Sequence, residues 1–109
     1  MKNFVYNKLV RDKIPAIIRR NGGIPSIAPL SAKRFLQELK KKLFEEGKEL
    51  ADAKGKEMVR EELSDVLEVL QGIASAKKIS WKAVLKKQKE KNVARGGFKK
   101  RIFLRSVKE

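Results

Sequence analysis

Two pairs of carboxylates stand in the middle of this sequence. Glu46 and Glu49 are three residues apart, and so are Glu62 and Asp65. Residues with this spacing on a helix share one face, so each pair would present its two carboxylates side by side. Carboxylates that gather in a partly buried place repel one another and lose hydration, so they need a compensating cation. Oxygen donors favour Mg²⁺ or Mn²⁺, and lysine or arginine side chains are the structural alternative.

The composition restricts the available chemistry to oxygen and amine groups. The chain has 109 residues and contains no cysteine, histidine or threonine. Disulfides, thiolate or imidazole metal sites, cysteine nucleophiles and Ser-His-Asp triads are therefore excluded. Carboxylates, Lys and Arg, serine hydroxyls, Tyr6 and a hard metal ion remain.

Basic flanks enclose an acidic centre. The 28 basic and 13 acidic residues give a net charge of +15, which attracts polyanions such as nucleotides, nucleic acid or an anionic membrane. Residues 41–76 hold 9 of the acidic side chains against 6 basic ones. A metal-dependent phosphate-handling site needs both signs of charge, whereas a general nucleic-acid binder has no evident need for an acidic centre.

Two long helices must position the carboxylates. Ser31 is a plausible N-cap for a helix to about Ala53, and Gly55 lies in the short break before a second helix, about 57–76. Each helix carries an apolar stripe that acidic residues interrupt. The stripes are Leu36, Leu39, Leu43, Glu46, Leu50 and Ala53 in the first helix, and Met58, Glu62, Asp65, Val69, Gly72 and Ala76 in the second. Helices joined by a short turn pack antiparallel, which would bring the two pairs together.

Shorter elements flank this hairpin. Asp12 and Pro15 mark the start of a short helix that ends at Asn21, and Ser80 caps a third helix to about Arg95, which Gly96 and Gly97 end. Residues 101–107 alternate enough to predict a terminal strand. The expected fold is mainly α, a single domain over residues 1–109: an antiparallel hairpin plus a third helix, with short termini that can form β-strands.

The apolar surface predicts self-association. A second stripe on the helix at 57–76 widens its apolar face, and three helices cover it poorly; its residues are Val59, Leu63, Val66, Leu70 and Ile73. We therefore expect a dimer or a larger homo-oligomer that completes a multi-helix bundle. The chain has no apolar run of signal-peptide or membrane-span length, so we expect a soluble, cytoplasmic protein.

The spacing of the carboxylates matches a known signature. The segment EEGKE at 45–49, twelve further residues and then ELSD at 62–65 resemble the EExxE…ExxD motif of the MazG-like, all-α nucleotide pyrophosphohydrolases. RGGF at 95–98 fits the later part of that pattern. The opening YNKLVRDKIP at 6–15 is similar to a branch described as phosphoribosyl-ATP pyrophosphohydrolase-like or house-cleaning enzymes.

This resemblance implies a reaction and a set of roles. Such enzymes cleave a nucleoside triphosphate between the α and β phosphates, giving the monophosphate and pyrophosphate. The resemblance also implies a homodimer or homotetramer. By motif position the ligands of Mg²⁺, or of Mn²⁺, would be Glu46, Glu49, Glu62 and Asp65. Glu45 would be a supporting group behind the ligands or the base for the attacking water. The phosphates would contact Lys91 and Arg95, with Lys8 and Arg11 as further candidates.

One departure from the family pattern bears on the substrate. Phosphoribosyl-ATP pyrophosphohydrolases typically carry an Arg-His pair where this chain has Arg95-Gly96. A nucleoside triphosphate is therefore the expected substrate, with damaged or non-standard nucleotides included. Two alternatives stay open: a basic helical module that binds nucleic acid without catalysis, and an assembly protein that has kept the fold but lost activity. If the protein is an enzyme, we expect it to bind nucleic acid only non-specifically.

Overall fold

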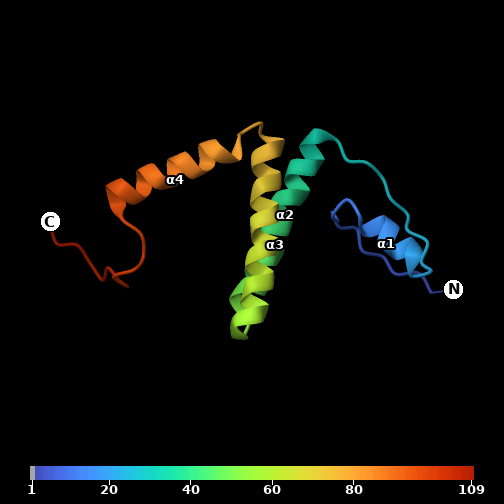
Figure 1. The fold of residues 1–109 in the computed structure, drawn as a ribbon, viewed down its shortest axis with the longest axis horizontal. Helices are drawn as coiled ribbons and strands as arrows, with labels where there is room; N and C mark the ends of the chain where they lie inside the picture. The colour runs from blue at the N-terminus through green and yellow to red at the C-terminus, as the bar shows by residue number, and fades with distance from the viewer. Residues whose placement is uncertain (1) are drawn as a thin grey trace. The chain divides into compact units, whose positions relative to one another are not determined.

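The computed structural model describes residues 2–109, which form four helices (Figure 1). They are α1 (Ile14–Arg20), α2 (Ala32–Asp52), α3 (Gly55–Ala76) and α4 (Trp81–Arg95). The chain divides into two compact units, one ending at Lys78 and one spanning Ile79–Glu109. The first contains α1, α2 and α3, and the second contains α4 and the C-terminal segment. None of the helices within residues 2–109 is long and apolar enough to cross a membrane.

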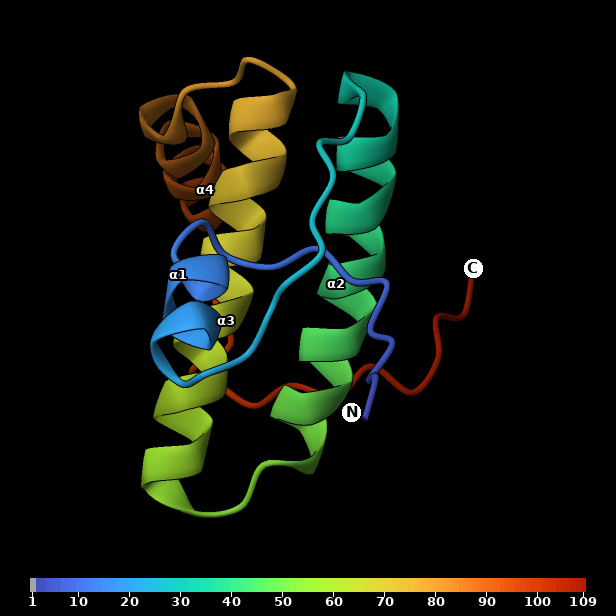
Figure 2. The same cartoon turned by 90° about the vertical axis from the view of Figure 1, so that its right-hand side faces the viewer.

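The central element is the predicted antiparallel hairpin of α2 and α3, which lie side by side (Figure 2). The Ser31 hydroxyl accepts a hydrogen bond from the Arg34 backbone N–H at 3.2 Å, so the predicted N-cap is confirmed. Helix α2 ends at Asp52, and the next residue, Ala53, has an extended backbone conformation. Helix α3 begins at Gly55, two residues before the predicted start. Gly55 has φ +79°, a conformation that glycine adopts without strain, and it thereby closes the short connection.

A small core holds the hairpin together. Leu39 of α2 and Val69 and Ala74 of α3 are buried, with exposed fractions of 6%, 5% and 7%. Gly72 allows a close approach, because a Cβ atom there would lie 3.1 Å from Leu39 Cδ2. The stripe of α2 that carries Glu46 is half-buried against α3, as predicted. On α3, however, Leu63 and Leu70 remain 54% and 39% exposed.

In the second unit the helix prediction is confirmed. Ser80 caps α4 by accepting a hydrogen bond from the Ala83 N–H at 3.2 Å, and Gly96, with φ +82°, follows the last residue of the helix.

The predicted terminal strand at 101–107 is wrong. None of residues 2–109 is in a strand, at either end of the chain. An extended segment becomes a strand only when a neighbouring strand pairs with its backbone N–H and C=O groups, and residues 101–107 have no such neighbour. Their side chains accordingly stay exposed, as in Ile102 (81%) and Phe103 (86%).

Candidate functional site

The hairpin brings three of the four predicted carboxylates together. Glu46 and Glu49 come from α2, and Glu62 comes from α3. One carboxylate oxygen of each lies within 4.8 Å of the others. We call these three residues the acidic cluster. The spacing of three along α2 places Glu46 and Glu49 together, and the antiparallel packing of α3 supplies Glu62.

Two oxygens of the acidic cluster are buried without a donor. Glu46 Oε2 and Glu62 Oε2 are shielded from solvent and have no hydrogen-bond partner among the described residues. The Glu46 side chain is only 15% exposed, and its nearest cation is Lys42 Nζ, 4.0 Å from Oε1. Burying a carboxylate oxygen without a hydrogen-bond donor or a cation destabilises the fold. A bound proton or metal ion at this site would remove that cost.

The same surroundings change the acidity of the cluster. Burial is the main cause that raises the pKa of Glu46 to about 7, and the charges of Glu49 and Asp65 add to it. Burial also raises the pKa of Glu62, again with help from the charges of Glu49 and Asp65. When Glu46 and Glu62 are both ionised, neither buried Oε2 atom has a hydrogen-bond donor. A proton on the Glu46 carboxyl would supply such a donor.

The fourth carboxylate, Asp65, has an arginine partner instead. Arg11 Nη2, from the segment before α1, donates to Asp65 Oδ1 at 2.8 Å. Asp65 therefore stands beside the acidic cluster rather than within it, although its charge is felt there. The two side chains are 53% and 37% exposed, so the pair lies at the surface. The sequence placed Asp65 on the correct face of α3 but contained no signal for this partner.

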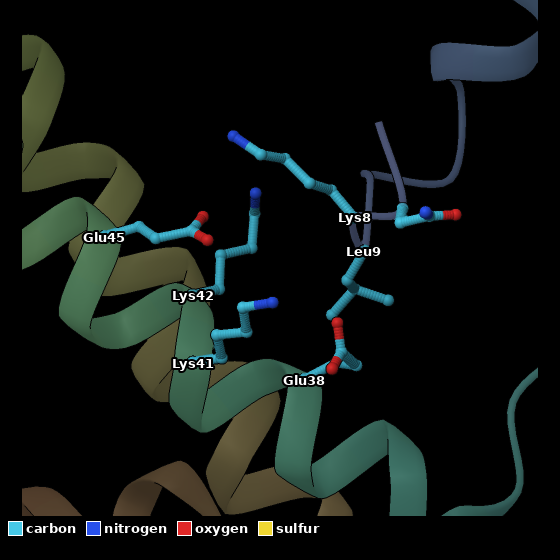
Figure 3. Close-up of a pocket in the computed structure, with 7 residues that line it drawn as sticks. Lys8, Leu9, Glu38, Lys41, Lys42 and Glu45 are labelled. Atoms are coloured by element: carbon cyan, nitrogen blue, oxygen red, sulfur yellow. The ribbon is translucent and has the colours of Figure 1, made fainter. Parts of the chain in front are cut away.

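Glu45 and Lys8 meet at a different place, a small pocket between the N-terminal segment and α2 (Figure 3). Its lining consists of Asn7, Lys8, Leu9, Glu38, Lys41, Lys42 and Glu45. We call it the lysine pocket. Sequence reasoning singled out Glu45 and Lys8 but missed Lys41 and Lys42. Lys42 precedes Glu46 by four residues, a helical ion-pair spacing that could have identified it.

Lys91 and Arg95 lie in the second unit, both exposed near the end of α4. Their spacing of four places them on one face of that helix. Their role as phosphate contacts stays a prediction.

The fold and the acidic cluster define the class: an all-α protein whose helical hairpin gathers carboxylates suited to an oxygen-preferring cation. The family model described as phosphoribosyl-ATP pyrophosphohydrolase matches residues 25–92, more than half of the chain. The chain belongs to the phosphoribosyl-ATP pyrophosphohydrolase family, in the MazG-like all-α superfamily, and this confirms the resemblance read from the motifs. No curated protein and no solved structure matches it.

The matched region coincides with the site only in part. It includes α2, α3 and most of α4, and therefore all four predicted metal ligands, Glu45 and Lys91. It leaves out Lys8, Arg11 and Arg95. Membership of the family supports a pyrophosphohydrolase, and the N-terminal segment adds basic side chains from outside the matched region.

Proposed function

We propose that this protein is a Mg²⁺-dependent pyrophosphohydrolase that cleaves a nucleoside triphosphate into the monophosphate and pyrophosphate. The observation that carries the proposal is the acidic cluster: three carboxylates within 4.8 Å of one another, two of them with a buried oxygen that lacks a partner. Family membership supplies the reaction class.

The donor set fits a hard divalent cation. Only carboxylate oxygens meet in the acidic cluster, which is the chemistry that Mg²⁺ and Mn²⁺ prefer. Glu46, Glu49 and Glu62 would hold the ion, and Asp65 would join them from the adjacent turn of α3. When bound, such a metal neutralises phosphate charge and lowers the pKa of a coordinated water. No histidine is then needed, which agrees with a chain that has none.

The other predicted site residues have separate tasks in this proposal. Glu45 is the base that takes a proton from the attacking water. The water oxygen bonds to the α phosphorus, and the bond from that phosphorus to the bridging oxygen breaks, so that pyrophosphate leaves. Lys91, Arg95, Lys8 and Arg11 bind the phosphates as cations, and the two arginines can offer two parallel donors.

The substrate is assigned to nucleoside triphosphates because of residue types at the end of α4. Arg95 is followed by Gly96, where phosphoribosyl-ATP enzymes resembling this chain typically have histidine. The proposed substrate therefore differs from the one in the name of the matched family, whereas the proposed bond cleavage is the same.

The deciding experiment measures pyrophosphate release with Mg²⁺ from a mixed nucleoside triphosphate pool and, separately, from phosphoribosyl-ATP. We expect release from the pool by the wild type and a loss of orders of magnitude in Glu49→Ala, because the remaining ligands hold the ion poorly. Glu68→Gln, an exposed carboxylate on α3, is the matched control and should keep full activity.

Two other results would contradict parts of the proposal. If pyrophosphate is released from phosphoribosyl-ATP alone, the proposed bond cleavage is correct but the proposed nucleoside triphosphate substrate is wrong. No release from either source, with nucleic-acid binding that survives Glu49→Ala and falls steeply with salt, would favour the basic nucleic-acid module instead.

A further inference from the structure

We propose that Arg11 competes with the metal ion for Asp65, so that an ion bound at the acidic cluster releases the N-terminal segment from α3. The metal ion itself rests on the proposed function. The competition rests on the contact between the two side chains and on the few other contacts that hold residues 2–13.

The contact between Arg11 and Asp65 is an isolated tertiary link. Arg11 Nη2 donates to Asp65 Oδ1 at 2.8 Å, and both groups carry a charge, which makes hydrogen bonds of this kind short and strong. Among residues 2–109 it is the only side-chain hydrogen bond that joins residues more than three positions apart. Asp65 lies within the region that matches the family, and Arg11 lies outside it. The contact therefore ties a segment beyond the matched region to the metal-binding hairpin.

Little else holds the N-terminal segment. Residues 2–13 contain no helix or strand, and all of them except Leu9 are exposed. Leu9 is half-buried and lines the lysine pocket beside α2. Loss of the contact between Arg11 and Asp65 would therefore remove the side-chain hydrogen bond that fixes the segment to α3.

The cation and Arg11 would need the same carboxylate. Asp65 follows Glu62 by three residues on α3, so the two side chains share a face. A guanidinium and a divalent cation at one carboxylate repel each other, which opposes simultaneous binding. Because the two side chains of the pair are 53% and 37% exposed, water can replace their contact at a small cost. The exchange would free Arg11 for the phosphate contact that the proposed function gives it.

The first test is calorimetric titration with Mn²⁺ in a double-mutant cycle. We expect Arg11→Ala to bind Mn²⁺ about two- to fivefold more tightly than the wild type, the range of an exposed ion pair. In Asp65→Asn, which binds the ion less tightly, the further change Arg11→Ala should have no effect. Lys13→Ala is the matched control. Lys13 is exposed, two residues away and in no ion pair among residues 2–109, so its loss should leave the affinity unchanged.

The second test measures release of the segment by limited trypsin cleavage. Trypsin must bind the Arg11 side chain to cut after it, so the contact with Asp65 protects that bond. We expect Mn²⁺ to accelerate this cut about two- to fivefold relative to cuts at residues 99–101, as followed by mass spectrometry. In Asp65→Asn the cut should be fast with or without Mn²⁺.

Three outcomes overturn the inference. The first is unchanged Mn²⁺ affinity in Arg11→Ala. The second is equal tightening in Lys13→Ala or in the Asp65→Asn background, because it would show a general charge effect. The third is a rate of cleavage after Arg11 that does not respond to Mn²⁺. Circular dichroism confirms that each variant is folded.

These results are separable from catalysis. If the wild type binds Mn²⁺ in competition with Arg11 but releases no pyrophosphate from any triphosphate, the proposed reaction fails and the competition stands. If the wild type is active and Arg11→Ala binds Mn²⁺ as the wild type does, the competition alone fails. A wild type that binds no Mn²⁺ would overturn both.

Discussion

At the residue scale, Glu46 combines a position in an apolar stripe with an ionisable side chain. Its side chain is only 15% exposed, and this burial, together with the charges of Glu49 and Asp65, raises its pKa to about 7. An apolar residue at this position would pack more favourably against α3. The cost of a carboxylate there is understandable if a bound cation offsets it in the working protein.

This acidity predicts how stability depends on pH in the absence of metal. The folded-state pKa of Glu46, about 7, is above the ordinary value of 4.5, so the folded protein binds this proton more tightly than the unfolded chain. The stabilisation is present below the ordinary pKa and is lost as the pH rises through about 7. With a chelator present, Glu46→Gln should therefore be more stable than the wild type at pH 8, by roughly 1–3 kcal/mol. The difference should shrink toward pH 5, as measured by denaturant unfolding.

Glu68→Gln provides the comparison for this prediction, because Glu68 is an exposed residue of the same hairpin. Its unfolding free energy should differ from the wild type by the same small amount at both values of pH. A Glu46→Gln variant that behaves in the same way would show that the carboxyl is not held in a costly environment.

Metal binding should reverse the repulsion within the acidic cluster. A cation that binds only the folded state stabilises it by mass action, so millimolar Mn²⁺ should raise the Tm of the wild type. The double variant Glu46→Gln/Asp65→Asn should lose that rise, because two of the four carboxylates become neutral amides. Differential scanning fluorimetry with and without Mn²⁺ measures both. An equal response of wild type and double variant would refute a shared metal site.

At the element scale, the α2–α3 hairpin depends on few buried contacts. Leu39 is the one residue of α2 that is fully buried among those described, and it packs against Gly72 of α3. Leu39→Ala should therefore destabilise the protein by about 2–4 kcal/mol, the range for leucine truncation in a core. Chemical unfolding followed by circular dichroism gives the value.

Phe44→Ala tests whether burial is the reason. It removes a larger apolar side chain from the same helix, but Phe44 is 80% exposed. The expected change is within about 0.5 kcal/mol. Comparable losses from Leu39→Ala and Phe44→Ala would mean that another surface covers Phe44, and that Leu39 is not the particular anchor of the hairpin.

Arg11 connects the N-terminal segment to this element. Its hydrogen bond to Asp65 spans 54 residues of sequence and joins the segment before α1 to α3. Because the two side chains are 53% and 37% exposed, the pair stabilises the fold by no more than about 1 kcal/mol. In the proposed function, this weak ion pair would open and leave Asp65 free to bind the metal ion.

At the scale of the whole molecule, the first unit leaves an apolar face on α3 uncovered. Leu63, Leu67 and Leu70 share this face at spacings of four and three, and they are 54%, 45% and 39% exposed. A hairpin with so small a core is marginal by itself. We therefore predict a dimer or a larger homo-oligomer that covers this face, with light scattering or sedimentation at micromolar concentration as the measurement.

A charge placed on that face distinguishes the outcomes. Leu67→Glu should shift the protein toward monomer and lower its Tm, because it would place a carboxylate in the interface. Lys82→Glu, on exposed α4, also introduces a carboxylate and should leave the oligomer intact. A wild type that stays a stable monomer would contradict the prediction.

The sequence by itself determined the parts of this protein that depend on local chemistry. The caps Ser31 and Ser80, the ends of the helices and the pairing of carboxylates at a spacing of three all follow from interactions within a few residues. The short turn at Gly55 then left antiparallel packing as the expected arrangement. The family could be recognised for the same reason, since its motif lies on these two helices.

The tertiary structure decided what depends on segments far apart in the chain. It placed Arg11 on Asp65 and Lys8 beside Lys41 and Lys42, and it left residues 101–107 without a strand partner. Helical periodicity specifies which face a side chain occupies, but not which distant segment reaches that face. That choice depends on the path of the connecting loops and on the balance of many weak contacts, which no local pattern encodes.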